Sequence, residues 1–250
     1  MILFLTYHKV VREKEVKPGF YTIRADQLER QLELLARSGF QPLQPQKLLD
    51  FKGSSTPAYV LSFDDGTQDH YDVVMPVLAR YKQRAIFFVP TAKLNRPGYL
   101  RTETVKTMSH QGHVIGSHSH EHRRLDWLVE EDIRVQLELS QQIVGQITGQ
   151  RPIIFAPPGG YVTRRVREVA IETGMRVIRT MKWGYNPRPD FVSLDCIPVN
   201  RHLTEMEFTR LLEFRNMAMI YRGKQIAKKL MPSKLYETAR EFLFGLVGRN

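Results

Sequence analysis

The sequence has little cysteine, which removes two classes of protein at once. Its 250 residues contain one cysteine, Cys196. An internal disulfide framework is therefore excluded, and so is a metal site built from several thiolates. We interpret Cys196 as a small buried hydrophobic residue. Nothing in the cysteine content demands an oxidising compartment.

Long apolar runs are also missing. No stretch approaches the ~18 apolar residues of a membrane-spanning helix. The apolar run at the start, within Met1–Thr6, is too short for a signal-peptide core, and no basic segment precedes it. If the natural chain begins at Met1, we expect a cytoplasmic protein. Association with a membrane surface, through a basic segment near the C-terminus, is a further expectation.

The charge balance is basic, with 37 Lys and Arg against 26 Asp and Glu and a formal net charge of +11. Such an excess attracts anions, whether nucleic acid, an acidic lipid surface or an acidic glycan. The sequence carries no helix-turn-helix, zinc-finger or RNA-binding signature, so we expect no nucleic-acid partner. Hydrophobic residues make up 42% and charged residues 25%, which is typical of a soluble globular protein and not of a disordered chain.

Short apolar runs alternate with longer helical patterns along the chain, which predicts a mainly parallel sheet wrapped by helices. Strands are expected at Ile2–Thr6, Tyr59–Phe63, Ala85–Val89, Val114–Ser117, Ile153–Ala156, Val177–Arg179 and Cys196–Val199. Helices are expected at Ala25–Ser38, Ile133–Ile147 and Val162–Thr173, where apolar residues recur at helical spacing before a glycine. A barrel and a doubly wound sheet both fit this pattern. In a barrel, the chemistry lies where strands end and loops begin.

The composition changes near Arg222. Lysines are frequent there, and an apolar helical face then follows, made of Leu235, Ala239, Phe242, Leu243 and Leu246. We therefore divide the chain into a domain over residues 1–221 and a basic, amphipathic helical extension over residues 222–250. We interpret the extension as a helix docked on the domain. The alternative is a helix that contacts a membrane surface or a partner.

Two adjacent carboxylates follow a buried strand in Tyr59-Val-Leu-Ser-Phe-Asp64-Asp65-Gly66. Burying two neighbouring charges is costly unless a cation or strong hydrogen-bond donors meet them. Neighbouring strand residues point in opposite directions, so Asp64 and Asp65 can have different functions. Asp-Asp-Gly is also an ordinary turn sequence, so this motif alone leaves a structural interpretation open.

A histidine-rich segment, Gly116-Ser-His118-Ser-His120-Glu-His122, follows another apolar strand. We expect a helical turn to place His118 and His122 on one face and His120 on another. Two imidazoles and one carboxylate form a facial metal site with open positions, and a second carboxylate is then free to accept a proton. The alternative is a polar loop without a ligand. The other histidines, His70, His110 and His113, show no ligand spacing, and we interpret them as surface or helix-terminal residues.

The two motifs together resemble those of the polysaccharide deacetylase family (the NodB homology domain, carbohydrate esterase family 4). Phe63–Gly66 resembles its first motif and His118–His122 its second, and the likeness covers approximately residues 1–207. The resemblance implies a single α/β domain, a distorted (β/α) barrel of about seven strands, with a C-terminal helical extension. It also implies that Asp65, His118 and His122 bind one divalent metal and that Asp64 is the catalytic base. Zinc is the default ion, and cobalt or nickel would suit the same ligands.

The third motif differs from the family pattern Arg-x-Pro-Tyr-Gly. Ala156 stands where the family arginine contacts the base carboxylate, so Arg179 and Lys182 are candidates for a replacement cation. The backbone N–H of Gly159 can still donate to an oxyanion, because that interaction needs no side chain. The candidate substrate-binding residues are Gly159, Gly160, Tyr161 and Trp183. For Trp183, plain packing is the alternative.

Two histidines are candidates for the general acid. The family commonly uses a late histidine in a Leu-x-His motif, which His202-Leu203 matches only loosely. Tyr7-His8 ends the first strand and resembles a subset of the family that makes or trims exopolysaccharides, in which an early histidine supplies the proton. We prefer His8 to His202.

We expect the protein to remove an N-acetyl group from an N-acetylated glycan or lipid-linked sugar. One alternative is an amidohydrolase of the same fold that acts on a small cyclic imide or amide. Another is a glycan-binding protein that has kept the metal site and lost turnover. The absence of the arginine at Ala156 is the main support for the latter.

Overall fold

The computed structural model describes residues 1–12 and 19–213. The chain divides into two compact units, Met1–Arg201 and a second that begins at His202. In the second unit the helix α6 spans Glu205–Leu212, and its first turn is capped reciprocally by Thr204 and Glu207. The expected extension over 222–250, its boundary after residue 221 and its contact with a membrane all fall outside the described residues.

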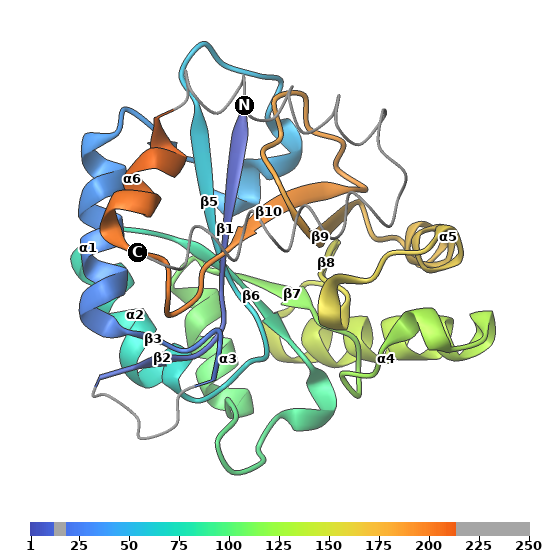
Figure 1. Ribbon diagram of the computed structural model, residues 1–250. Helices are drawn as coiled ribbons and strands as arrows, with labels where there is room; N and C mark the ends of the chain where they lie inside the picture. Colours follow the sequence, from blue (N-terminus) through green and yellow to red (C-terminus); the bar gives the residue numbers. More distant parts are fainter. Residues whose placement is uncertain (13–18, 214–250) are drawn as a thin grey trace. The chain divides into compact units, whose positions relative to one another are not determined.

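Seven parallel strands of the first unit close into a barrel. Their order around the ring is β1 (Ile2–Tyr7), β5 (Ala58–Phe63), β6 (Ala85–Val89), β7 (Val114–Ser117), β8 (Ile154–Phe155), β9 (Val177–Trp183) and β10 (Leu194–Pro198). Figure 1 shows β1 between β5 and β10, and its pairing with both closes the ring. The predicted (β/α) barrel is thus confirmed, and a doubly wound sheet is excluded.

Three further strands in the described residues lie outside the barrel and contain two residues each. β2 (Val10–Val11) pairs with β3 (Ile23–Arg24) in a separate sheet, and β4 (Gln41–Pro42) pairs with the start of β5. Short 3-10 segments are η1 (Pro45–Asp50), η3 (Thr91–Lys93), η4 (Leu125–Trp127) and η5 (Pro158–Gly160). A π-helical turn, η2 (His70–Val74), lies just after the double-carboxylate motif, and such turns are frequent at functional sites.

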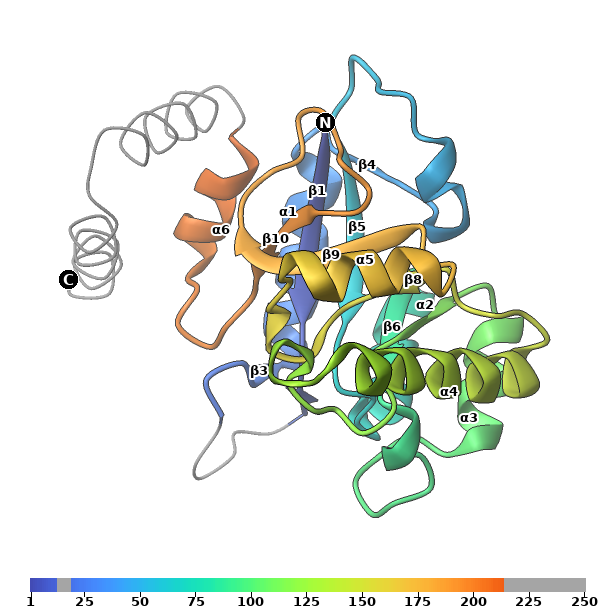
Figure 2. The ribbon, with the colours of Figure 1, turned by 90° about the vertical axis from the view of Figure 1, so that its right-hand side faces the viewer.

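Within the described part of the first unit, five α-helices alternate with the barrel strands along the chain. They are α1 (Ala25–Arg37), α2 (Met75–Arg80), α3 (Thr102–His110), α4 (Glu130–Thr148) and α5 (Arg164–Glu172). The predictions for α1, α4 and α5 are confirmed, although α4 begins three residues before the expected Ile133. Its first turn holds Glu130, Glu131 and Asp132, whose charges suit the positive end of a helix. Figure 2 shows α4 and α5 side by side, and an apolar cluster that includes Leu137, Val169 and Phe155 packs this layer onto the barrel.

The barrel interior is filled by alternate strand residues. Ile2, Phe4, Val60, Ile86, Phe88, Ile154 and Val177 belong to one buried cluster. In a strand every second side chain lies on the same face. Gly116 continues this inward set on β7, and a Cβ there would lie 2.6 Å from the Phe88 ring, so glycine leaves the space that Phe88 fills. None of the helices in the described ranges is long and apolar enough to span a membrane.

Candidate metal centre and catalytic site

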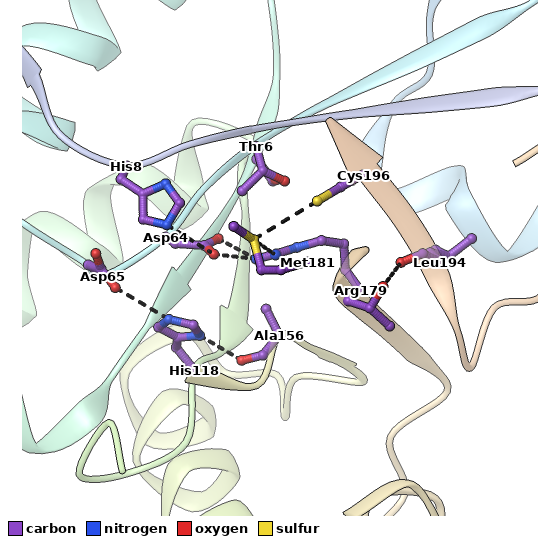
Figure 3. Close-up of polar contacts among 12 residues, drawn as sticks. Thr6, His8, Asp64, Asp65, His118, Ala156, Arg179, Met181, Leu194 and Cys196 are labelled. Atoms are coloured by element: carbon purple, nitrogen blue, oxygen red, sulfur yellow. Dashed lines mark hydrogen bonds and ion pairs between the residues drawn. The ribbon is translucent and has the colours of Figure 1, made fainter. Parts of the chain in front are cut away.

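At the carboxyl ends of the barrel strands, the inward-facing side chains change from apolar to polar. On β5 it runs from Val60 through Ser62 to Asp64, and on β7 from Gly116 to His118. His8 follows β1 in the same alternation, and Arg179 occupies an inward position within β9. Figure 3 shows the side chains of His8, Asp64, His118 and Arg179 converging at one place. The period of two in the strands thus brings together residues that are far apart in the sequence.

A left-handed turn separates the two adjacent carboxylates. Asp65 has φ 77° and Gly66 has φ 60°, so the chain reverses direction immediately after Asp64. The Asp65 Oδ1 atom lies 3.4 Å from Nε2 of His118 and 3.0 Å from Nε2 of His122. Positive φ is uncommon for a residue other than glycine. It directs Asp65 to the two imidazoles, while Asp64 continues the inward-facing alternation of β5.

His118 and His122 meet through a loop, and the expected helical turn was wrong. Ser119 and His122 have φ values of 60° and 64°, which no helix contains. The loop is held by a hydrogen bond from the His122 N–H to Ser119 Oγ, at 3.2 Å. The two rings lie 4.8 Å apart at 63°. His120 is directed elsewhere, as expected, and its Nδ1 pairs with Thr91 Oγ1 at 2.8 Å.

The donor atoms of Asp65, His118 and His122 fit one divalent ion. One ligand atom from each residue lies within 4.8 Å of the others. Donors at the corners of a tetrahedral zinc site are about 3.3 Å apart when the bonds have their usual lengths. Nδ1–H of His118 donates to the Ala156 carbonyl at 2.6 Å, which orients the ring with Nε2 toward Asp65, where Nε2 could bind an ion once it has lost its proton.

The charges in this group also suit a cation. Burial alone would raise the pKa of Asp65, but hydrogen bonds from His118 and His122 outweigh burial and hold that pKa well below its usual range. Burial lowers the pKa of His118, while the hydrogen bond to Asp65 and the charge of Asp64 raise it overall. Asp65 is therefore an ionised carboxylate, as a metal ligand must be.

Asp64 forms a buried ion pair with Arg179. The Arg179 side chain is fully buried, and its Nη2 donates to both carboxylate oxygens of Asp64. Burial disfavours the guanidinium charge, but Asp64 more than compensates and raises the pKa of Arg179. Lys182, the other candidate cation, lies on the opposite face of β9 and is exposed. Arg179 thus supplies the cation that Ala156 cannot.

His8 lies beside Asp64, with its Nε2 atom 3.9 Å from Asp64 Oδ2. Its ring stacks on Tyr21, at a centroid distance of 4.5 Å and an angle of 15°. Burial lowers the pKa of His8, and the negative charges of Asp64 and Asp65 partly offset that effect. His8 is therefore held in one orientation next to the base candidate.

His70 supports the backbone of His8. It begins the π-helical turn η2, so its interpretation as a surface or helix-terminal residue holds for the helix terminus, but it does not lie on the surface. It is fully buried, and Nε2–H of His70 donates to the His8 carbonyl at 2.8 Å. Asp69 accepts a hydrogen bond from the Val10 N–H at 2.7 Å. The turn after the first motif thus fastens the loop that carries His8. His113, also interpreted as a surface or helix-terminal residue, is buried too.

The predicted substrate-binding residues lie on two strand ends. Gly159 and Gly160 form the turn η5 after β8, and a Cβ on Gly160 would lie 2.2 Å from the Met181 Cβ atom. Tyr161 follows this turn and is half exposed. Trp183 ends β9 and packs edge-to-face on Tyr185. His202 begins the second unit, so its candidacy as general acid stays a prediction, as do the roles of the other four.

Comparison with curated proteins extends the likeness beyond the motifs. A family model described as polysaccharide deacetylase matches residues 52–178, slightly more than half of the chain. The chain is 32% identical over 133 residues to a peptidoglycan-N-acetylglucosamine deacetylase of Bacillus cereus, covering 51% of this chain and 58% of that protein. It is 24% identical over 184 residues to YxkH of Bacillus subtilis, covering 72% and 64%. The chain therefore spans less than two thirds of either relative.

Solved structures support the same fold. The Streptococcus pyogenes deacetylase PplD in complex with acetate has a TM-score of 0.76 at 20% identity, over 84% of this chain and 97% of that one. IcaB from Ammonifex degensii has a TM-score of 0.75 at 21% identity, over 85% and 96%. At this level of identity, the similarity to solved structures establishes only the fold, whereas the family model establishes similarity of sequence. Because the barrel, both motifs and the family model agree, this chain belongs to the polysaccharide deacetylase family.

Proposed function

We propose that this protein is a metal-dependent hydrolase that removes N-acetyl groups from an N-acetylated glycan or lipid-linked sugar. One observation carries the proposal. Asp64 and Asp65 are adjacent in sequence, yet Asp65 faces two imidazoles and Asp64 faces Arg179 and His8. A deacetylase needs both environments, one for a metal ligand and one for a proton acceptor.

A divalent ion held by Asp65, His118 and His122 would polarise the amide carbonyl and lower the pKa of water, and zinc, cobalt and nickel all suit these ligands. Asp64 accepts the proton of the attacking water, and Arg179 keeps Asp64 oriented. The Gly159 N–H donates to the oxyanion. His8 then protonates the departing nitrogen as the C–N bond breaks. The products are acetate and an amino sugar.

The substrate class follows from the relatives. The matched proteins of Bacillus cereus and Listeria monocytogenes are both named peptidoglycan-N-acetylglucosamine deacetylases. The chain covers only 58% and 28% of their lengths. We therefore extend to this protein only the acetamido sugar, and not the polymer that those proteins act on.

The structure weakens the alternative of a glycan-binding protein without turnover. Its main support was Ala156 in place of the family arginine. Arg179, from the next strand, donates to both oxygens of Asp64 instead. The base candidate therefore has a buried cationic partner, and we favour catalysis.

Acetate release from a panel of N-acetylated glycans tests the proposal directly. We expect a chelator to abolish acetate release and added zinc, cobalt or nickel to restore it. The reason is that the proposed reaction needs an ion, which the three ligand candidates would hold. Acetate is measured by an enzyme-coupled assay, with the heat-treated protein as control. Release that is unaffected by complete removal of metal contradicts the proposed mechanism, and the absence of release from every glycan contradicts the proposed activity.

Replacing His8 by alanine is expected to slow the chemical step by about 10²-fold, the lower end of the usual contribution of a general acid. An acid must be protonated to act, so activity falls as the pH rises through its pKa. Burial lowers the pKa of His8, which places this alkaline limb below that of an exposed imidazole. His8→Ala should remove the limb and leave the metal content unchanged, as pH–rate profiles and elemental analysis will determine.

His110→Ala is the matched control, because His110 is an exposed residue of α3. It should keep the wild-type profile. His202→Ala separates the two acid candidates. An alkaline limb that persists in His8→Ala and disappears in His202→Ala would assign the acid to His202.

A further inference from the structure

Two aromatic side chains are exposed in the loops after β7 and β8, beside the candidate site. Trp127 is 74% exposed and Tyr161 is 50% exposed. Large aromatic rings are normally well buried, so exposed rings near a site are informative. Trp127 ends η4, in the loop that continues from His122, and Tyr161 follows the Gly159–Gly160 turn. The two rings therefore belong to the loops after β7 and β8, which are neighbours in the barrel.

One guanidinium joins the two rings. The Arg124 Cζ atom lies 3.5 Å from the centroid of the Tyr161 ring and 4.3 Å from that of the Trp127 ring. We call Arg124, Trp127 and Tyr161 the aromatic platform. Arg124 is two residues beyond His122, and two residues of extended chain span at most about 7 Å. The platform thus begins directly beside the metal ligands.

The platform is rigid and its charge is compensated. Asp126 accepts hydrogen bonds from Nε and Nη2 of Arg124, the first at 3.0 Å. Arg165, in the first turn of α5, donates to the Asp126 carbonyl at 3.2 Å and ties the two loops together. Because Asp126 neutralises Arg124, the platform offers ring faces rather than a net positive charge.

We propose that the aromatic platform binds a second sugar ring of the glycan whose acetamido residue occupies the metal site. This inference rests on the proposed function. Aromatic faces suit the apolar C–H face of an uncharged sugar ring, and a compensated guanidinium can still donate to hydroxyl groups. The substrate is accordingly an oligomer or polymer with at least one neutral sugar beyond the reacting one, and not a lone monosaccharide.

The size of the platform favours a sugar over a protein partner. Each aromatic side chain buries roughly 150–250 Å² when it is covered. Two rings therefore supply much less than the ~800 Å² that each partner buries in a stable protein interface. They match one or two sugar rings.

Opposite the platform the barrel carries another aromatic pair. Tyr21 stacks on His8 after β1, and Phe20, 54% exposed, packs edge-to-face on Tyr21. In a ring of seven strands β1 lies three strands away from both β7 and β8. The metal ligands thus lie between the platform and this pair. A chain that reaches the platform crosses the site instead of ending at it.

Steady-state kinetics with the monosaccharide N-acetylglucosamine and with its tetramer test the proposal, using wild type, Trp127→Ala and Trp127→Phe. Trp127→Ala should raise the tetramer KM by about tenfold with little change in kcat, since one stacked ring is lost. Trp127→Phe keeps a smaller ring and should give an intermediate KM. The monosaccharide constants should not change. Ile171→Ala, which removes an exposed apolar side chain of α5, is the control and should match wild type.

A tetramer KM that is unchanged in Trp127→Ala overturns the proposal, and so does an equal change for both substrates. If wild type releases acetate from neither substrate, the proposed function fails on its own. In that case, calorimetry of tetramer binding tests separately whether the aromatic platform binds the glycan. Weaker binding to Trp127→Ala than to wild type supports the platform, and equal binding, or none to wild type, overturns it.

Discussion

Replacing Asp64 by asparagine is expected to lower turnover by about 10³-fold while the metal content per chain stays unchanged. Asparagine has nearly the size of aspartate but cannot accept the water proton at a carboxylate. Asp64 is buried and pairs with Arg179, whereas the three ligand candidates form a separate group. Turnover is measured by acetate release and metal by elemental analysis. Near-normal turnover would show that Asp64 is not the base.

The same substitution should also destabilise the fold, which has to be separated from the loss of chemistry. Arg179 is fully buried, and Asp64→Asn removes its only carboxylate partner among the described residues. Leaving one charge of a buried pair uncompensated costs about 3–5 kcal/mol in the free energy of unfolding. The double variant Asp64→Asn with Arg179→Met removes both charges and places an apolar side chain near Phe88 and Met181. Its thermal stability should recover while its turnover stays low. Recovery of turnover in the double variant would contradict a role for Asp64 in catalysis.

Replacing His118 by alanine is expected to reduce metal affinity by more than the ~10–100-fold that loss of a ligand's outer partner typically causes. His118 is buried, and the Ala156 carbonyl holds its ring so that Nε2 faces Asp65. Alanine leaves two ligands and an unfilled position. Elemental analysis after dialysis against a weak chelator should show most of the metal lost, and acetate release should be lost with it.

His120→Ala is the matched control for this experiment. His120 lies two residues away in the same loop but pairs with Thr91, outside the group of ligand atoms. It should therefore retain its metal. Full metal occupancy in His118→Ala, or an equal loss in both variants, would show that His118 is not a ligand.

The barrel could be predicted because all of its strands except β8 are long enough to leave a pattern in the sequence, and the two residues of β8 lie within the longer apolar run Ile153–Ala156. The runs that became β6 and β7 have the predicted bounds, since both are buried apolar segments of four or five residues between polar turns. The two-residue strands β2, β3 and β4 leave no such pattern. α2 was also missed. It has six residues and continues from a π-helical turn, so its apolar positions do not keep one helical period.

The sequence predicted which residues form the candidate site, but not how the backbone brings them together. The four-residue spacing of His118 and His122 indicated that their side chains meet. They meet because two residues of the loop, Ser119 and His122, have left-handed backbone conformations. No propensity scale predicts a left-handed conformation for Ser119. The choice of Arg179 over Lys182 depended on which β9 side chains face the barrel interior. The sequence did not show that β9 continues to Trp183. His8 contacts Tyr21 and His70, and these contacts could not be predicted because the segments become neighbours only in the folded barrel.

The closure of the barrel has a consequence for synthesis of the chain on the ribosome. β1 is made first, and its second edge pairs with β10, where Leu5 is opposite Ile197. At the usual rate of synthesis, the chain needs roughly 10 to 40 s to extend from one to the other. Until then β1, whose six residues are all buried in the finished barrel, has one unpaired edge, and such edges invite pairing with other chains. The tendency to aggregate is therefore concentrated in the nascent protein and ends when β10 joins the ring.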